Sequence, residues 1–241
     1  MDARRRACLE AMGLPAWSRR PDRILPGAPF PAVQERVAQQ ADAPAAEENP
    51  ARLDWDALEA RVSSCTACAL HAGRTRTVFG VGARDADWLI VGEAPGAEED
   101  RQGEPFVGRA GKLLDAMLAA LGQSRAQVYI ANTVKCRPPQ NRNPLPAETD
   151  CCAPFLDRQI ELLAPRIILA VGAVAARRLL ATDAPVGRLR GQVHHYGPAS
   201  IPLVVTWHPA YLLRKPEAKA GAWQDLVLAA GAAGAPRGSP G

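Results

Sequence analysis

The chain has 241 residues, of which 47% are hydrophobic, and a formal net charge of +4 at neutral pH. This length and composition fit one sizeable globular domain with a tail, and no apolar run is long enough to span a bilayer. The basic start of the chain lacks an apolar signal segment, so we expect a cytoplasmic protein.

Residues 1–52 are rich in proline, alanine and charged side chains and show no sustained hydrophobic period. This pattern is typical of a disordered or loosely packed tail. An apolar island within it consists of Leu9, Met12, Leu14 and Trp17. We interpret the island as a frayed helix, and the alternative is a docking helix for a replication or repair protein within residues 1–20. Residues 232–241 are also expected to be disordered.

Buried strands alternate with helices in the rest of the chain. A first helix is predicted at residues 54–63, with Asp54 as its N-cap. Apolar runs predict strands at residues 88–91, 128–132, 167–171 and 203–206, with a weaker strand near Val193 and Tyr196. Helical patterns lie at residues 112–121, 148–163, 174–180 and 216–230. The alternation predicts a three-layer α/β/α sandwich around a mostly parallel sheet of about four strands.

The first predicted strand leads into a loop that is rich in carboxylates. Within residues 87–111, the loop carries Glu93, Glu98, Glu99 and Asp100. Open α/β sheets bind ligands beyond the carboxyl ends of their strands, and this loop is long for an idle connection. We therefore expect chemistry here. A solvated acidic surface and a magnesium site are the alternatives.

Three other side chains follow predicted strand ends. Asn132 ends the second strand, His208 follows the fourth, and Phe106 lies in the loop after the first. Because parallel strands share one carboxyl edge, these side chains would meet there and would suit a planar heterocycle. Taken singly, they are equally explained as a loop cap, a turn histidine and a core aromatic. No glycine-rich phosphate fingerprint follows a strand, which disfavours a nucleotide cofactor.

Four of the six cysteines are candidates for one metal centre. Cys65 and Cys68 form a C-x-x-C pair, whereas Cys136 and Cys152 are distant in sequence. Thiols in a cytoplasmic chain indicate metal binding more than disulfides, and four thiolates hold either zinc or an iron–sulfur cluster. The spacing favours neither group, and Cys151 competes with Cys152 for the fourth position.

Basic residues cluster in the loops after the strands. They are either ordinary surface charges or a rim that binds phosphates at one sheet edge. The residues are Lys135, Arg137, Arg142, Arg188, Arg190, Arg214 and Lys215.

The chain resembles the bacterial and archaeal family 4 uracil-DNA glycosylases in four segments: GEAPGAEED, PFVGRAG, NTVKCRPPQNRNP and HPAYLLR. The resemblance covers about residues 53–228, and we expect the glycosylase domain at residues 53–231. It implies a single α/β/α domain with a [4Fe–4S] cluster that removes uracil from DNA without a nucleotide cofactor.

The resemblance also implies roles for individual residues in and around the uracil pocket. Glu93 and Glu99 would lie near the sugar and the attacking water, and His208 near O2 of uracil. The expected substrate-binding residues are Gly92, Ala94, Gly96, Phe106 and Asn132, with Phe106 stacked on the base and Asn132 bonded to its Watson–Crick edge. Ala94 stands where family 1 enzymes carry aspartate, so the group that positions the water stays open.

Two further sets of residues follow from the resemblance. The cluster ligands would be Cys65, Cys68, Cys136 and Cys152. The expected DNA-binding residues are Arg137, Arg142, Arg190, Tyr211, Leu212 and Arg214, with Tyr211 and Leu212 as part of a wedge that enters the base stack.

The resemblance implies a monomer that acts on uracil-containing single- and double-stranded DNA and lies in the cytoplasm with the nucleoid. The alternative is a non-catalytic iron–sulfur or zinc DNA-binding module tied to replication or repair. A relative that traps uracil-DNA covalently would need a histidine in the loop after Cys136, and this loop has none.

Overall fold

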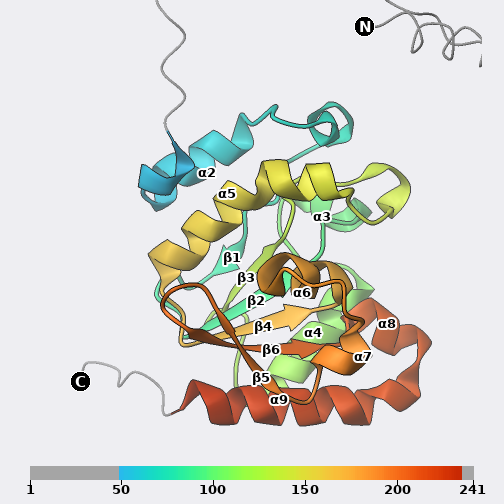
Figure 1. The fold of residues 1–241 in the computed structure, drawn as a ribbon. Helices are drawn as coiled ribbons and strands as arrows, with labels where there is room; N and C mark the ends of the chain where they lie inside the picture. The colour runs from blue at the N-terminus through green and yellow to red at the C-terminus, as the bar shows by residue number, and fades with distance from the viewer. Residues whose placement is uncertain (1–48, 235–241) are drawn as a thin grey trace, which may run out of the picture. The chain divides into compact units, whose positions relative to one another are not determined.

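The computed structural model describes residues 49–234 (Figure 1). The predicted docking segment, residues 1–20, and the C-terminal residues 235–241 lie outside this range, so the expectations for them stay predictions. Within the described range, no helix combines the length and the apolar character needed to cross a membrane.

The centre of the fold is a six-stranded sheet with the order β1-β3-β2-β4-β6-β5. Its strands are β1 (Val81–Gly82), β2 (Trp88–Gly92), β3 (Tyr129–Asn132), β4 (Ile167–Val171), β5 (Val193–Tyr196) and β6 (Ile201–Thr206). The four inner strands run parallel, whereas β1 and β5 pair antiparallel at the edges. The mostly parallel sheet and the weaker strand are confirmed. Beyond the four inner strands and this weaker one, the prediction missed β1, because β1 has only two residues and carries no periodic signal.

The helices follow the predicted order with short additions. Asp54 caps the first one as predicted, because its side chain accepts a hydrogen bond from the backbone N–H of Ala57 at 2.9 Å. The α-helices are α2 (Trp55–Ser63), α3 (Ala97–Gln102), α4 (Arg109–Ala120), α5 (Pro146–Leu163), α6 (Ala173–Leu180), α7 (Val186–Leu189), α8 (Pro209–Arg214) and α9 (Lys219–Ala233). The 3₁₀ turns are η1 (Pro50–Arg52), η2 (Ala69–Gly73), η3 (Pro139–Asn141) and η4 (Pro216–Ala218). Helices α3, α7 and α8 were not predicted, because helices of four to six residues are too short to show a period.

Helices cover both faces of the sheet (Figure 1). Successive residues of β2 point to opposite faces. Leu89 and Val91 pack in the core with residues of α5 and α6, whereas Trp88 and Ile90 pack in the core with residues of α4 and α9. The predicted three-layer α/β/α architecture is therefore confirmed. Burial on both faces also explains why the strand sequences are continuous apolar runs.

The parallel pairing brings the carboxyl ends of distant strands to one edge. Gly92 at the end of β2 pairs with Asn132 at the end of β3, and Val171 of β4 pairs with Thr206 of β6. The loops that leave these strands therefore start side by side, which is the arrangement that builds ligand sites in open α/β sheets.

Arg190 fastens α9 to the sheet. Its Nε lies 3.0 Å from Oδ2 of Asp225, a fully buried carboxylate on α9. Asp225 also accepts hydrogen bonds from the N–H of Gly191 at 3.0 Å and from Oγ1 of Thr206 at 2.8 Å. A buried charge needs such partners. The guanidinium of Arg190 is thus committed to an internal ion pair, which corrects its predicted role in DNA binding.

Candidate active site

A cavity of about 490 Å³ opens at the carboxyl edge of the sheet. Its volume is in the usual range of small-molecule sites, about 300–1,000 Å³. The loops after β2, β3 and β6 form its walls, together with α8. The predicted site residues that line it are Glu93, Ala94, Gly96, Glu99, Phe106, Asn132, Arg142, His208, Tyr211 and Arg214.

Phe106 and His208 form a stacked pair in this cavity. Their ring centroids lie 5.6 Å apart with an angle of 28° between the planes. Phe106 has a left-handed backbone with φ of +56°, a strained conformation for a bulky residue. Arg125 holds it there by donating to the carbonyl oxygens of Pro105 and, at 3.2 Å, of Phe106. Sequence analysis missed Arg125, because nothing in the local sequence marks a contact across nineteen residues.

Gly92 does not line the cavity but makes room for it. A Cβ added at this position would lie 2.4 Å from Oδ1 of Asn132 and 2.6 Å from the Phe106 ring. Both distances are far below van der Waals contact, so any larger residue would displace the amide, the ring or both. Gly92 was predicted as a substrate-binding residue, and the structure gives it an indirect part in shaping the site.

Asn132 carries a buried acceptor without a donor. The residue is only 2% exposed, and its Oδ1 has no hydrogen-bond partner among the described residues. Leaving a buried polar atom unpaired costs about 1–3 kcal/mol, so such atoms are rare outside functional sites. The amide at the end of β3 is therefore prepared for a donor that a ligand brings.

His208 is held as a neutral hydrogen-bond donor. The backbone N–H of Ala210 donates to its Nδ1 at 3.1 Å, so a neutral ring carries its proton on Nε2. Burial and, to a smaller extent, the positive charge of Arg214 lower the pKa of His208 to about 4, while the charge of Glu99 opposes the shift. The imidazole therefore stays uncharged at neutral pH.

The two predicted catalytic carboxylates differ in what they contact. Glu99 accepts hydrogen bonds from the backbone N–H groups of Gly96, Val107 and Gly108, each at 3.1 Å. It therefore ties the start of α3 to the loop after Phe106. Glu93 makes no side-chain hydrogen bond or ion pair within residues 49–234, and burial raises its pKa. Glu93 is thus the carboxylate that is open to a ligand.

The other acidic residues of this loop have protein partners. Asp100 is buried and accepts from the backbone N–H of Thr75 at 2.9 Å, and Glu98 pairs with Arg101. Within residues 49–234, the acidic side chains of this loop do not form a group of three that could hold a metal ion. The alternative reading of this run as a magnesium site therefore has no support.

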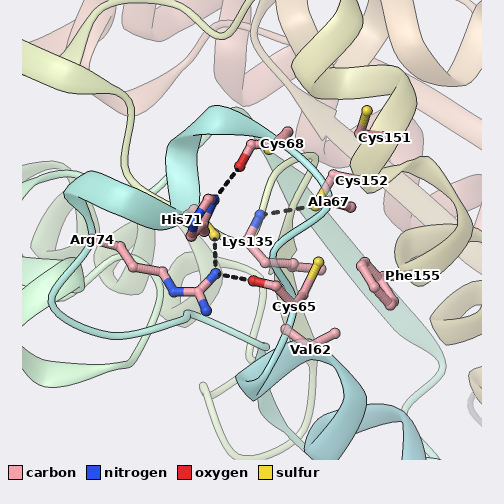
Figure 2. A pocket seen from close by; sticks show the side chains of 11 residues that line it. Val62, Cys65, Ala67, Cys68, His71, Arg74, Lys135, Cys151, Cys152 and Phe155 are labelled. Carbon is pink, nitrogen blue, oxygen red and sulfur yellow. Dashed lines mark hydrogen bonds between the residues drawn. The ribbon is translucent and has the colours of Figure 1, made fainter. Parts of the chain in front are cut away.

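A second cavity gathers the cysteines (Figure 2). Cys65 and Cys68 follow α2, Cys136 follows β3, and Cys151 and Cys152 lie in α5. Cys152 is buried and Cys151 is exposed, and Figure 2 shows the Cys151 sulfur directed away from Cys65 and Cys152. The four thiols predicted as ligands therefore line one cavity, although they are not drawn into the close group that holds a metal ion.

Positive and N–H groups face these sulfur atoms. Nη1 of Arg74 donates to Sγ of Cys136 at 3.0 Å, and the backbone N–H of Lys135 donates to Sγ of Cys152 at 3.3 Å. Burial raises the pKa of Cys152 to about 12 and also raises the pKa of Cys136. A bound group with positively charged metal centres would compensate this cost by stabilising the thiolates.

The comparisons with known proteins give the family. Residues 79–227 match the family described as "Uracil DNA glycosylase superfamily". The chain is 40% identical over 182 residues to the type-4 uracil-DNA glycosylase of Pyrobaculum aerophilum, a match covering 73% of this chain and 93% of that protein. It is 47% identical over 157 residues to the Thermotoga maritima type-4 enzyme, covering 64% of this chain and 80% of the relative. The chain belongs to the type-4 uracil-DNA glycosylase family.

Two residues expected to bind DNA in a type-4 uracil-DNA glycosylase have other surroundings here. Leu212 is 1% exposed and is buried in the protein interior, whereas its neighbour Leu213 is 39% exposed. The wedge prediction is therefore wrong for Leu212. Arg137 does not line the cavity, and its Nε donates to Oδ1 of Asn141 at 2.7 Å.

The other two cationic candidates do line the cavity. Arg142 donates from Nη1 and Nη2 to the Glu148 carboxylate at 2.8 and 2.6 Å, so its charge is already paired. Arg214 is exposed and makes no ion pair within the described chain. Tyr211 stacks on Trp207 with centroids 4.7 Å apart. Of the two cations that line the cavity, Arg214 is thus the one without an ion pair among residues 49–234.

Replacing Glu99 by alanine should loosen the loop of this type-4 enzyme without unfolding it. The change removes the acceptor of three amides, at a cost of about 1–3 kcal/mol in the free energy of unfolding. Amide hydrogen exchange at Gly96, Val107 and Gly108 should accelerate together. Glu98→Ala is the matched control, because Glu98 pairs only with exposed Arg101 and should change stability by about 0.5 kcal/mol or less. Unchanged exchange in Glu99→Ala would contradict this role.

Proposed function

We propose that the protein excises uracil from DNA by hydrolysing the N-glycosidic bond, which leaves free uracil and an abasic site for base excision repair. The observation that carries this proposal is the joint placement of Phe106, Asn132, His208 and Glu93 around one cavity. The rival reading as a non-catalytic DNA-binding module explains neither the unpaired amide oxygen nor the neutral histidine.

Recognition of the base begins with its removal from the stack. The glycosidic bond is inaccessible inside a duplex, and flipping the nucleotide costs about a few kcal/mol. Stacking on Phe106 returns about 1–3 kcal/mol. The unpaired Oδ1 of Asn132 accepts the N3–H of uracil. Cytosine has no hydrogen on N3, so it would leave this buried acceptor unpaired and is rejected.

Cleavage of the N-glycosidic bond leaves negative charge on uracil and positive charge on the sugar, and one residue acts on each. Nε2–H of His208 donates to O2 of uracil, where negative charge develops. The Glu93 carboxylate stabilises the cation-like sugar and orients the attacking water. We assign the water to Glu93 alone, because the oxygens of Glu99 are engaged by three backbone amides. Ala94 has no polar side chain and therefore cannot help to position the water.

The mouth of the cavity carries side chains that can replace a flipped base and bind the DNA backbone. Tyr211 lines it and Leu213 is exposed beside it, so these two side chains take the place of the flipped base. The unpaired guanidinium of Arg214 binds a backbone phosphate. We propose a monomer that works on uracil-containing single- and double-stranded DNA in the cytoplasm, in association with the nucleoid.

We further propose that Cys65, Cys68, Cys136 and Cys152 hold a [4Fe–4S] cluster. The convergence of four thiols on one cavity and the N–H donors to two of the sulfurs fit such a group. When bound, the cluster braces the chain at these thiols. Cys136 and Cys152 enclose the loop that carries Arg142, so the brace fixes one wall of the cavity.

An excision assay tests the function directly. Single-stranded and duplex oligonucleotides with one uracil should give abasic-site cleavage with the unaltered protein. His208→Ala and Asn132→Asp should slow excision by about 100- to 1,000-fold, because the first removes the donor to O2 and the second puts a carboxylate charge against the negative charge that develops on the base. DNA affinity, measured by anisotropy, should stay within about threefold. His195→Ala, an exposed histidine of β5, is the control that keeps full activity. Normal rates in both active-site variants would refute the assigned roles.

The rate advantage of His208 should persist in acid. A histidine whose pKa is lowered to about 4 keeps its neutral form well below the ordinary pKa near 6.5. The ratio of the unaltered rate to the His208→Ala rate should therefore be constant from pH 8 to about pH 5 and decrease toward pH 4. Taking the ratio cancels the protonation of Glu93, which affects both proteins. A ratio that falls with a midpoint near pH 6.5 would show that His208 is not held neutral.

The fourth cluster ligand is testable by a pair of neighbouring substitutions. Cys152→Ser should abolish the brown colour and the absorption near 400 nm expected of the cluster, because the buried thiol faces the cavity. Cys151→Ser should keep both the colour and four irons per chain. Iron retained in Cys152→Ser and lost in Cys151→Ser would reverse the assignment. Colourless unaltered protein with stoichiometric zinc would replace the cluster by a zinc site.

A further inference from the structure

Lys135 lies between the two sites: it lines the thiol cavity but not the base-binding cavity. It is 1% exposed and is among the largest fully buried side chains of the described chain. It lies three residues after Asn132 and immediately before Cys136, and it does not line the base-binding cavity. A lysine is rarely found so deep without a specific reason.

The ammonium group of Lys135 holds the main chain of Asn132. Its Nζ donates to the carbonyl oxygen of Asn132 at 3.0 Å and to Oε1 of Gln159 at 2.5 Å. Gln159 is itself fully buried, and its Nε2 donates to the carbonyl of Phe79 at 3.0 Å and to the Tyr129 hydroxyl at 3.2 Å. The lysine thus ties the end of β3 to a fixed point on α5.

The backbone of Lys135 is fixed as well. Its N–H donates to Sγ of Cys152 at 3.3 Å, a contact shown in Figure 2, and its carbonyl accepts from the N–H of Val78 at 2.8 Å. One residue therefore contacts the thiol site with its main chain and the base-reading residue with its side chain. These contacts leave Asn132 little freedom to rotate about the end of the strand.

Burial of this cation is costly, because no carboxylate in residues 49–234 forms an ion pair with it. Packing alone does not explain it, since an apolar residue of similar volume would fill the space with no charge to desolvate. The carbonyl of Asn132 and Oε1 of Gln159 supply the hydrogen-bond acceptors that a buried ammonium requires, and Cys152 is the neighbouring group whose negative charge would favour it. The hydrogen bond to the Asn132 carbonyl sets the orientation of the peptide that carries the unpaired amide.

We propose that Lys135 is a positioning residue for uracil recognition, which fixes Asn132 in its base-reading orientation and joins it to the thiol site. The inference rests on the proposed excision of uracil. Lys135 acts through Asn132 and touches no substrate atom.

Lys135→Met tests the role, because methionine keeps an unbranched apolar stem and removes the donor. Excision of uracil should slow by about 10- to 100-fold, as expected for a small displacement of a recognition group. Affinity for DNA with a tetrahydrofuran abasic analogue, which lacks a base, should stay unchanged. The absorption near 400 nm should also be kept. Lys112→Met on the exposed side of α4 is the control and should excise at the unaltered rate. An unaltered rate in Lys135→Met would overturn the proposal.

A double-mutant cycle separates positioning from general destabilisation. In an Asn132→Ala background, Lys135→Met should cost less than about twofold, because the residue through which it acts is gone. If the rate losses of the two single variants instead multiplied in the double variant, Lys135 would have a purely structural role and the inference would be overturned.

A second variant covers the case in which Lys135→Met does not fold. Lys135→Met leaves Oε1 of Gln159 without its donor, and adding Gln159→Leu removes that unpaired acceptor. The double variant should show the same loss of excision rate as Lys135→Met. A normal excision rate in the double variant would also overturn the proposal. Absence of excision by the unaltered protein would instead refute the proposed function itself.

Discussion

The parallel pairing of β2 with β3 is the constraint on which the site depends. It places Gly92 beside Asn132, and only a residue without a Cβ allows the amide and the Phe106 ring to approach so closely. The same sheet brings the loop after β6, with His208, to this edge. The chemistry of the cavity is therefore a product of strand order. No single loop holds enough of the site to bind a base.

Several groups in the cavity are held in states that reduce stability. Phe106 has a left-handed backbone, Asn132 has an unpaired oxygen, Glu93 is a partly buried carboxylate, and His208 is kept from protonation. The first three cost free energy in the free protein at neutral pH, whereas the lowered pKa of His208 costs stability only in acid, and the two cores that flank the sheet offset these costs. Such groups are already desolvated and oriented before the substrate arrives. This preorganisation is what transition-state stabilisation requires.

The strands and most of the helices could be predicted from the sequence, because buried parallel strands are continuous apolar runs. Because parallel strands share one carboxyl edge, the sequence also predicted that Phe106, Asn132 and His208 lie close together. Contacts between distant residues could not be found in this way. Tertiary packing decides three of them: the ion pair of Arg190 with Asp225, the hydrogen bond from Arg125 to the Phe106 carbonyl, and the burial of Leu212 rather than Leu213. The different surroundings of Glu93 and Glu99 likewise depend on where the loop amides point.

The loop between β3 and α5 begins next to Cys136 and ends at the turns that carry Cys152, and it forms one wall of the cavity. Both thiols pack in a core of their own with residues of α2 and α5, separate from the two cores that flank the sheet. Oxidative damage at the thiols would therefore loosen this wall while the two cores that flank the sheet stay packed. An aged preparation would then melt at nearly its original temperature and yet repair no DNA, so thermal stability is a poor measure of its quality.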